Sequence, residues 1–502
     1  MEQLDVLFVN PNASRKNYQA LSRDLSAIEP PVWAALLANH TRRNGLETAI
    51  LDCEAERIDP LASAKRIKEF NSRLTVIVVY GQHPAASTQN MEGVHHLCET
   101  MKDYYPEYKI ILVGIYPSAL SRKTMEDEKI DFVCQGEGPL TITALSQVDM
   151  NDVSQLKKVP GLWFRDRGNI QCTSPASIIP RENLHEILPG MAWELLSIEK
   201  YRTANWHAMS NNNERTPFAS LYTSLGCPYS CSFCCTNAPF GSNNLDNSNG
   251  VTSFRYWDPN FIIGEFDKIY EMGVRNIKIA DEMFIFNVNH FMEVCELIIE
   301  RGYDFNIWCY GRIDTIKVEY LETLKKAGVN WLAVGVESAS SYVRQDVVKG
   351  NFSKTNIIEL VQSVKDTGIN IIGNYIFGLP EDNYETMRDT LGLAIELNCE
   401  FVNFYTAMAY PGSALYIEAL KNKWPLPETY SGFSQHSFDT LPLPTKYISS
   451  SDVLRFRDEA FHTYYTNSNY LAMIDSKFGQ DAVQMINEMI SHKLDRKTLI
   501  ED

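Results

Sequence analysis

Short runs of apolar, β-branched residues alternate with helical patterns through the first third of the chain. Because these runs are apolar without a break, they are typical of strands in a parallel sheet that is covered on both faces. Residues 31–44 have apolar side chains at helical spacing, and Gly45 follows as a stop signal. The pattern therefore predicts an α/β domain of the Rossmann-like kind. The expected strands are 4–9, 46–51, 74–79, 109–113 and 130–134.

The loops that follow four of these strands are rich in Gly, Pro and polar residues. Ligands of parallel sheets bind outside the carboxyl ends of the strands. Each loop alone is equally well explained as a turn, but four on one rim favour a binding edge. The loops are Asn10-Pro11-Asn12, Gly81-Gln82-His83-Pro84, Gly114-Ile115-Tyr116-Pro117-Ser118 and Gly136-Glu137-Gly138.

The alternation stops after about residue 146 and resumes at about residue 219. Six further strand–helix units predict a partial version of the eight-fold βα barrel, a (βα)6 TIM-like core. The last segment is Pro-rich and then helical, at 452–465 and 480–490. We expect domains at 1–148, 216–423 and 424–502, with a connector at 149–215. The expected barrel strands are 219–224, 276–280, 306–310, 331–336, 370–376 and 401–406.

Charge and composition narrow the classes of function. The 502 residues carry a net charge of −17, which argues against a nucleic-acid backbone or an anionic membrane as main partner. The N-terminus has no basic and apolar leader, and no apolar run approaches the roughly 18 residues of a membrane span. The eleven cysteines are odd in number and mostly isolated, so a disulfide framework is not expected. A cytoplasmic location follows as the expectation.

Three cysteines stand together directly after the first predicted barrel strand. The spacing of Cys227, Cys231 and Cys234 is C-x3-C-x2-C, and soft thiolates select iron–sulfur clusters, zinc or copper(I). Structural zinc needs four ligands, and no second pair follows at finger spacing. Three ligands on a four-iron cluster leave one iron open, as catalysis requires. Zinc remains the minor alternative.

This cysteine motif, with Phe233 before its last cysteine, resembles the radical SAM superfamily. The resemblance implies a [4Fe–4S] cluster on the three cysteines, whose open iron binds S-adenosylmethionine and whose electron cleaves it to methionine and a 5′-deoxyadenosyl radical. Matching features follow later strands, namely Asp281-Glu282, Glu337-Ser338 and the stretch GNYIFGLPE at 373–381. The implied S-adenosylmethionine contacts are Phe233, Asp281, Glu282, Arg312, Glu337 and Ile376.

Each of these contacts has a structural alternative. The two acidic residues Asp281 and Glu282 are also compatible with a solvated turn, and Glu337 with a helix cap. Arg312 is equally well explained as an ion-pair partner or as a contact to the S-adenosylmethionine carboxylate.

An α/β domain ahead of such a core is similar to the cobalamin-binding branch of the superfamily. The stretches GIYPSAL and DFVCQGEGP match that branch, whereas the D-x-H-x-x-G motif that supplies a histidine below cobalt is absent from the sequence. His83 and Tyr116 are the nearest candidates to face the corrin, with His83 also explained as a loop residue bonded to backbone. The implied cobalamin contacts are Asn10, Pro11, Gln82, His83, Gly114, Tyr116, Pro117, Ser118, Gly136, Glu137 and Gly138.

The leading hypothesis is a cobalamin-dependent radical S-adenosylmethionine methyltransferase that acts on an unactivated carbon of a small molecule. The resemblance implies that one S-adenosylmethionine methylates cobalamin and a second supplies the radical, with a flavodoxin or ferredoxin as external reductant. The alternatives are a cyclase or rearrangement enzyme with the same cofactors, an iron–sulfur electron-transfer protein, and a zinc-binding module. No residue is assigned a catalytic role beyond cofactor binding.

Two further segments are candidates near the site. The stretch 239–253 is rich in Asn, Ser and Gly, and either covers the active site or forms a plain surface loop. In the tail, the aromatic side chains either line a pocket or pack the domain. They are Tyr430, Phe433, His436 and Phe438.

Overall fold

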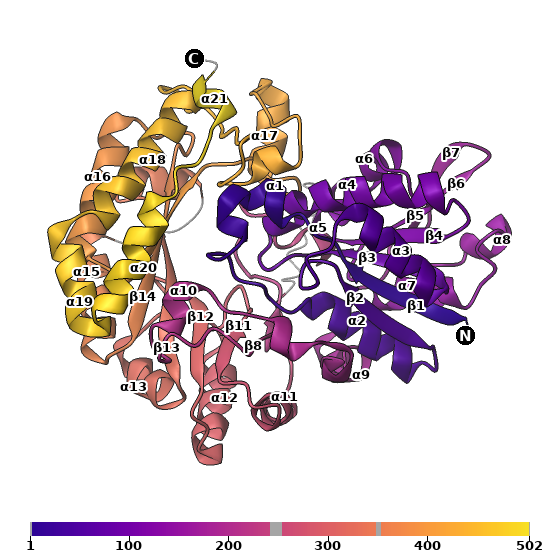
Figure 1. Ribbon diagram of the computed structural model, residues 1–502, viewed down its shortest axis with the longest axis horizontal. Coiled ribbons are helices and arrows are strands. Elements are labelled where there is room, and N and C mark those ends of the chain that lie inside the picture. Colours follow the sequence, from indigo (N-terminus) through magenta and orange to yellow (C-terminus); the bar gives the residue numbers. More distant parts are fainter. Residues whose placement is uncertain (1–2, 241–253, 348–352, 501–502) are drawn as a thin grey trace.

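The computed structural model describes residues 3–240, 254–347 and 353–500. Two parallel sheets lie side by side, and a layer of C-terminal helices covers the second of them (Figure 1). The predicted insertion at 239–253 falls almost wholly outside the described residues.

The first sheet has the strand order β2-β1-β3-β4-β5-β6-β7, and its first five strands are parallel. This is a doubly wound order, in which the chain switches direction between β1 and β3 and leaves a crevice at their carboxyl ends. The strands are β1 (Leu4–Asn10), β2 (Thr48–Asp52), β3 (Ser72–Val79), β4 (Lys109–Gly114), β5 (Phe132–Cys134), β6 (Leu162–Asp166) and β7 (Asn169–Cys172).

Helices cover both faces of this sheet, as the unbroken apolar runs predict. Alternate residues of β1 point to opposite sides, so Val6 and Phe8 enter one core while Leu7 and Val9 enter the other. The first core is closed by α2 (Val32–Arg43) and α7 (Pro139–Ser146). The second is closed by α3 (Pro60–Phe70) and α4 (Ala86–Tyr104).

The strands β6 and β7 form a hairpin that the sequence did not predict. They lie in the expected connector, where β6 pairs antiparallel with β5 and β7 pairs with β6. Their burial is uneven along the strands, and a two-stranded edge ribbon needs no continuous apolar run. The hairpin therefore extends the first sheet past residue 148.

The second sheet is a partial barrel of six parallel strands in the order β15-β14-β13-β12-β11-β8. It confirms the expected (βα)6 core. The strands are β8 (Phe218–Leu221), β11 (Asn276–Ile279), β12 (Asn306–Arg312), β13 (Val329–Glu337), β14 (Asn370–Phe377) and β15 (Phe401–Thr406). The helices between them are α11 (Pro259–Glu271), α12 (Val288–Arg301), α13 (Val318–Lys326), α14 (Ser341–Asp346), α15 (Lys354–Asp366) and α16 (Tyr384–Leu397).

The predicted strand at 219–224 is shorter than expected. The barrel strand β8 ends at Leu221, and β9 (Ser224–Leu225) leaves the barrel to pair antiparallel with β10 (Arg255–Tyr256). The break occurs where Thr223 and Ser224 donate hydrogen bonds to Asp281. The polar side chains turn the chain toward the cysteine loop that follows.

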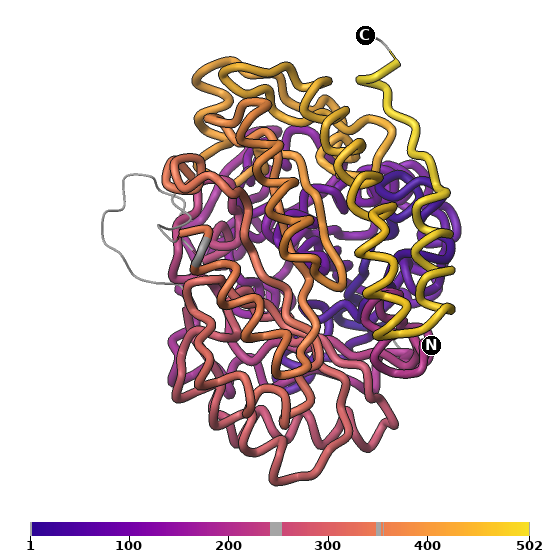
Figure 2. Tube along the Cα trace, turned by 90° about the vertical axis from the view of Figure 1, so that its left-hand side faces the viewer, coloured from indigo at the N-terminus to yellow at the C-terminus, as the bar shows by residue number. Residues whose placement is uncertain are grey.

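The C-terminal helices form a layer on the outer side of the barrel, beside its edge strand β15 (Figure 2). Tyrosine hydroxyls fix them there, because Tyr465 Oη donates to Val402 O at 2.7 Å and Tyr470 Oη donates to Glu400 O at 3.1 Å. The helices of this layer are α18 (Ser450–Tyr465), α19 (Ser468–Phe478), α20 (Gln480–Ser491) and α21 (Lys497–Ile500). The helix α17 (Ala414–Asn422) lies apart from them, and its Leu415 N bonds to Ser232 O of the cysteine loop (Figure 1).

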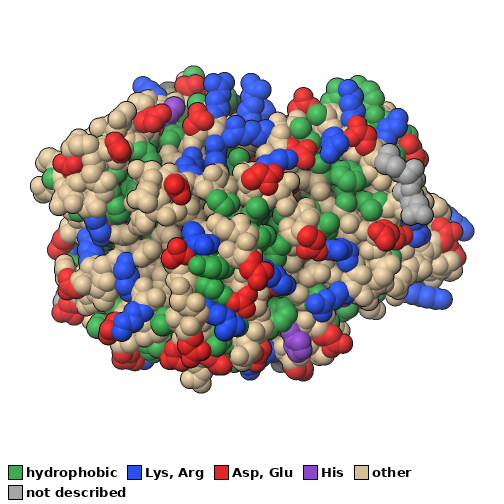
Figure 3. Space-filling model, turned by 60° about the horizontal axis from the view of Figure 1, so that its bottom comes forward, with side chains coloured by type: hydrophobic (Ala, Val, Ile, Leu, Met, Phe, Trp, Pro, Cys, Tyr) green, Lys and Arg blue, Asp and Glu red, His purple; other side chains and the backbone are tan. Residues whose placement is uncertain are grey.

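The surface is charged on the face that Figure 3 shows, where acidic and basic side chains are interspersed over the molecule. No described helix combines the length and the apolar character that crossing a lipid bilayer would demand.

A buried ion pair joins the two sheets. Lys278, on β11, reaches out of the barrel with its side chain only 2% exposed, and its Nζ lies 2.9 Å from Glu29 Oε2. The same Nζ donates to Gln82 O, in the loop after β3, at 2.6 Å, and lies 4.8 Å from the centre of the Trp308 ring. This ammonium therefore ties the barrel to the carboxyl edge of the first sheet.

Replacing Lys278 with methionine is expected to lower the free energy of unfolding by about 3–5 kcal/mol, because Glu29 is left buried without its counter-charge. The thermal unfolding midpoint measures the loss. The double variant K278M/E29Q removes both charges and should recover part of the stability. A single variant as stable as the unmodified protein would show that this pair does not join the domains.

Candidate active site

The carboxyl ends of both sheets face a common cavity of about 430 Å³, which we call the reaction cavity. From the barrel come the three cysteines of the loop after β9, together with residues at the ends of β12 to β15. From the first sheet come His83, Pro84 and Ala85, after β3, and Gln89 on α4. Two domains thus build one site.

The cysteine loop is held rigidly although it has no regular structure. The Asn237 side chain accepts from Cys227 N at 3.2 Å and donates to Cys227 O at 3.0 Å. Ser232 N donates to Val347 O at 3.2 Å, and Ser232 O accepts from Leu415 N at 2.8 Å. The loop is therefore clamped between α14 and α17, and its three thiols face the reaction cavity.

Among the described residues, the potential metal-ligand atoms that all lie within 4.8 Å of one another belong to one group, His95, His96 and Glu99 on α4. None of these three residues lines the reaction cavity, which the three cysteines do line.

Burial keeps the thiols of Cys227 and Cys234 protonated until a metal binds. It raises the pKa of Cys227 to about 12, with the nearby Cys234 sulfur as the second cause, and it also raises the pKa of Cys234. Metal-bound thiols are deprotonated, so loading of the loop releases protons.

The adjacent acidic residues Asp281 and Glu282 have different roles. Asp281 is fully buried and accepts three hydrogen bonds of 2.6 Å, two from Thr223 and one from Ser224. It therefore holds the start of β9 and does not line the reaction cavity. Glu282 lines the cavity, and its buried Oε2 has no hydrogen-bond partner among the described residues. Burial, with the neighbouring Asp281 charge, raises the pKa of Glu282 to about 8.

Arg312 forms the ion pair that was one of its two expected roles, and it also lines the reaction cavity. Its guanidinium makes two hydrogen bonds to Asp314, of 2.9 and 2.8 Å, and stacks 3.8 Å from the centre of the Tyr229 ring. Its Nη1 also lies 3.6 Å from Cys231 Sγ. The ion pair thus fixes a positive charge against one thiol and at the wall of the reaction cavity.

The last residue of β13, Glu337, has a left-handed backbone with φ of 64°. Such a conformation is costly for a residue with a side chain, and it coincides with an irregularity in the pairing of β13 with β14. The strained turn directs Glu337 to the reaction cavity, which Phe233 and Ile376 also line. Five of the six expected S-adenosylmethionine contacts therefore line one cavity, and Asp281 supports them from outside.

The expected cobalamin contacts divide into two groups, of which the first lies at the switch between β1 and β3. His83 lines the reaction cavity, while Gln82 and Asn10 line small hollows next to it. His83 Nδ1 accepts from Ala86 N, at the start of α4, at 3.2 Å. Burial and the nearby Lys278 charge lower the pKa of His83 to about 4, so the ring is neutral and its proton sits on Nε2.

The second group has protein partners of its own. A Cβ on Gly114 would lie 2.3 Å from Val79 O, so this glycine is required by strand packing. Tyr116 is 3% exposed and packs edge-on against Tyr430, with ring centres 5.4 Å apart. Glu137 forms a buried ion pair of 2.8 Å with Arg255. Of the eleven expected cobalamin contacts in both groups, ten do not line the reaction cavity, namely Asn10, Pro11, Gln82, Gly114, Tyr116, Pro117, Ser118, Gly136, Glu137 and Gly138.

The sheet edge nevertheless suits an amide-rich ligand such as a corrin. Carboxamide side chains gather at the carboxyl ends of β1 and β3 and on the helices next to them. Asn17 is 2% exposed and its Oδ1 has no hydrogen-bond partner in the described chain, although its Nδ2 donates to Gln89 O at 3.2 Å. The carboxamides are Asn10, Asn17, Gln82, Gln89 and Asn90.

Sequence reasoning missed several residues that line the reaction cavity. Asn374, Asn403 and Tyr405 occupy inward positions on β14 and β15, and a polar residue within an apolar strand was the available signal. Tyr18 ends the short helix α1 (Ser14–Tyr18) and Gln435 lies in an irregular segment, so neither gave such a signal. Of the tail aromatics, His436 lines the cavity, whereas Phe433 is buried and Phe438 is 41% exposed.

Two known protein families match the two domains that build the reaction cavity. The radical SAM superfamily matches residues 221–394, and the B12 binding domain matches residues 19–146. The chain belongs to the cobalamin-binding branch of the radical SAM superfamily. It is therefore an enzyme of the class that uses a [4Fe–4S] cluster, S-adenosylmethionine and cobalamin, which leaves no place for the electron-transfer and zinc-module alternatives.

Relatives of this radical SAM enzyme cover most of its length. An uncharacterised methyltransferase of Pyrococcus horikoshii is 24% identical over 94% of each chain. The anaerobic magnesium-protoporphyrin IX monomethyl ester cyclase of Cereibacter sphaeroides is 23% identical over 82% of this chain and 63% of its own. The methyltransferase TsrM of Kitasatospora setae, solved with cobalamin and a [4Fe–4S] cluster bound, has a TM-score of 0.66 at 14% identity over 96% of this chain and 99% of its own. The shared fold supports the domain arrangement.

Proposed function

We propose that this protein is a cobalamin-dependent radical S-adenosylmethionine methyltransferase that methylates an unactivated carbon of a small molecule. The observation that carries the proposal is the reaction cavity itself. Cys227, Cys231 and Cys234 line it from the barrel, and His83 and Gln89 line it from the first sheet. A substrate in this cavity contacts both domains at once.

When bound, the cluster and cobalamin supply the electron that cleaves S-adenosylmethionine and the methyl group that is transferred. The chain's own residues bind these groups and orient them. We assign the cluster to the three cysteines and the S-adenosylmethionine ammonium to Glu282, whose buried oxygen lacks a partner among the described residues. We assign the carboxylate of S-adenosylmethionine to Arg312 and its nucleoside to Glu337 and Ile376.

The reaction cavity also protects a radical. Its walls carry Tyr310, Tyr405 and Tyr410, which burial keeps protonated by raising the pKa of each hydroxyl. Enclosure of this kind excludes water and stray reductant from the reacting carbon. We propose a flavodoxin or ferredoxin as the external one-electron donor.

A second candidate function is cyclisation or rearrangement without methyl transfer. It is favoured by the likeness to the magnesium-protoporphyrin IX monomethyl ester cyclase, a relative that matches 82% of this chain. Both candidates use the same cavity, so the fate of the methyl group decides between them.

Incubation with S-adenosylmethionine labelled in its methyl group tests the proposal. A methyltransferase transfers the label to the product and forms 5′-deoxyadenosine and S-adenosylhomocysteine together. Product without label, formed alongside 5′-deoxyadenosine, would replace the proposal by the cyclase. Failure to form 5′-deoxyadenosine with dithionite as reductant would overturn both.

A further inference from the structure

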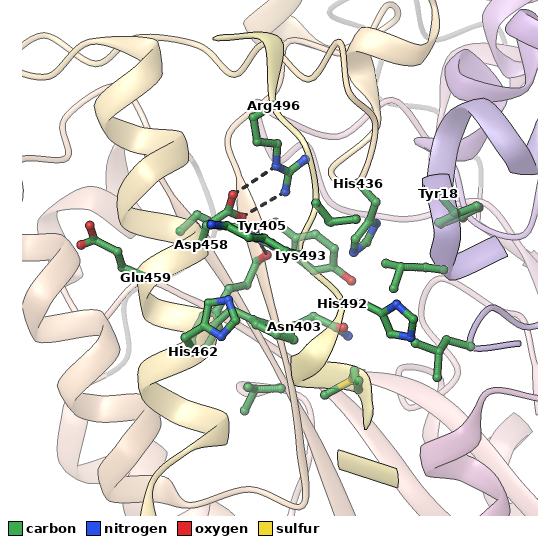
Figure 4. Close-up of a pocket in the computed structure, with 18 of the residues that line it drawn as sticks. Tyr18, Asn403, Tyr405, His436, Asp458, Glu459, His462, His492, Lys493 and Arg496 are labelled. Carbon is green, nitrogen blue, oxygen red and sulfur yellow. Dashed lines mark hydrogen bonds and ion pairs between the residues drawn. The ribbon is translucent and has the colours of Figure 1, made fainter. Parts of the chain in front are cut away.

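A second, larger cavity adjoins the reaction cavity, and we call it the outer cavity. Its volume is about 990 Å³, at the upper end of the range for small-molecule sites. It lies between the C-terminal helices, the inward side of β15 and the segment from Tyr18 to Ala27 of the first domain. Tyr18, Asn403, Tyr405 and His436 line both cavities, so the two meet at these side chains (Figure 4).

The side chains at the junction are neutral, so a ligand can enter without the cost of desolvating a charged side chain. Burial lowers the pKa of His436 to about 3, helped by Arg457 and Arg496, so the ring is neutral. Its ring centre lies 5.7 Å from that of Tyr18. Asn403 Nδ2 donates to Asn374 Oδ1, inside the reaction cavity, at 3.0 Å. The passage is thus lined by neutral polar and aromatic groups.

One wall of the outer cavity holds a buried excess of positive charge. Arg457 and Arg496 are 6% and 3% exposed, and both pair with the single carboxylate of Asp458, at 2.8 and 3.0 Å. Arg457 Nε donates a hydrogen bond to Phe404 O, and its Nη1 donates one to Asp458. Its Nη2 makes no hydrogen bond with the part of the chain that the structure describes. An anion would neutralise this excess.

Further cationic and donor groups face the same space. Figure 4 shows the side chains of Lys493 and His462 directed into the cavity between Asp458 and Asn403. Neither side chain forms a hydrogen bond or ion pair with the described residues. Four Arg or Lys and three Asp or Glu line the cavity. One of the four cations, Arg455, is paired with Asp452 at 2.6 Å, so Arg457, Arg496 and Lys493 are the cations that face an anion in this space.

Apolar side chains also line the outer cavity. Leu21 and Leu25 line it from the first domain, and Met489, Leu494 and Leu499 line it from the C-terminal segment. We propose that the outer cavity binds the substrate as an elongated, largely apolar molecule with an anionic group. Arg457, Lys493 and His462 hold the anion, and the carbon to be methylated passes the junction into the reaction cavity. This inference rests on the proposed function and adds the substrate class.

Calorimetric titration of the reconstituted holoenzyme at low ionic strength tests this inference, with decanoate, decanol and decylammonium as probes. We expect decanoate to bind most tightly and decylammonium most weakly. The K493E variant should weaken decanoate binding about tenfold and leave decanol unchanged. Lys497→Glu, a matched exposed lysine outside the cavity, should change neither. Leu25→Asn should weaken decanoate and decanol alike.

Decylammonium binding as tightly as decanoate, or equal effects of K493E and K497E, would overturn the inference, as would failure of all three probes to bind. Iron content and 5′-deoxyadenosine formation, measured on the same preparation, report on the proposed function independently. Loss of the anion preference in a protein that cleaves S-adenosylmethionine therefore overturns the substrate class alone.

Discussion

Replacing Cys231 with alanine is expected to abolish both the brown absorbance of the iron–sulfur cluster and the cleavage of S-adenosylmethionine. We assign the cluster to three thiols, and two cannot retain it with an open iron for the sulfonium cofactor. The visible absorbance of the iron–sulfur cluster measures the first effect. The amount of 5′-deoxyadenosine formed with dithionite as reductant measures the second. Activity should fall to background, because no other described cysteine lines the reaction cavity.

Cys235 provides the matched control for this variant. It directly follows Cys234 but is 2% exposed, and it does not line the reaction cavity. Cys235→Ala should therefore keep the cluster and the cleavage activity, at a modest cost in stability. Retention of both by C231A, or their loss in C235A alone, would show that the cluster is held by other residues.

Replacing Glu282 with glutamine is expected to weaken S-adenosylmethionine binding by about 30-fold. The variant keeps the size of the side chain but removes the charge that we assign to the ammonium group, a loss of about 2 kcal/mol. Equilibrium dialysis of the cluster-loaded protein measures it. Glu271→Gln, an exposed glutamate at the end of α11, is the control and should bind normally.

The Glu282 prediction has a pH dependence of definite sign. The pKa of Glu282 is raised to about 8, so the carboxyl is largely protonated below that pH and must ionise to pair with the ammonium. Affinity of the unmodified protein, relative to E282Q, should therefore rise as the pH increases through about 8. A ratio that stays constant between pH 6.5 and 8.5 would contradict the assignment. Comparison with E282Q cancels the titration of the ligand itself.

Local patterns were sufficient to predict the two sheets and the metal loop. Unbroken apolar runs locate both sets of parallel strands, and Cys227, Cys231 and Cys234 are adjacent in sequence, so their spacing alone brings them together. Phe233, Glu282 and Glu337 were expected from the family resemblance, and all three line the reaction cavity at the carboxyl ends of the barrel strands.

Other features depend on tertiary contacts and have no local signal. Asp281 and Glu282 are neighbours of the same charge, and only the hydrogen bonds from Thr223 and Ser224 decide which one turns away from the cavity. Tyr116 follows a glycine-rich strand end, yet its ring packs on Tyr430, more than 300 residues away in the chain.

The outer cavity is the clearest case of a feature that the sequence could not predict. Its walls come from α1 and the segment after it, from β15 and from α18 to α21, segments that are distant in the chain. Arg457 and Arg496 lie in an ordinary helical tail, where charged residues usually face solvent. Their burial around Asp458 becomes visible only when α18 and the segment before α21 pack together.

The account depends on one cavity that receives an iron–sulfur cluster from the barrel and cobalamin from the first sheet. Anaerobic reconstitution with iron, sulfide and cobalamin, followed by metal analysis and absorption spectra, tests this most directly. We predict about four iron atoms and about one cobalamin per chain. Zinc in place of iron, or a protein that stays colourless after reconstitution, would contradict it.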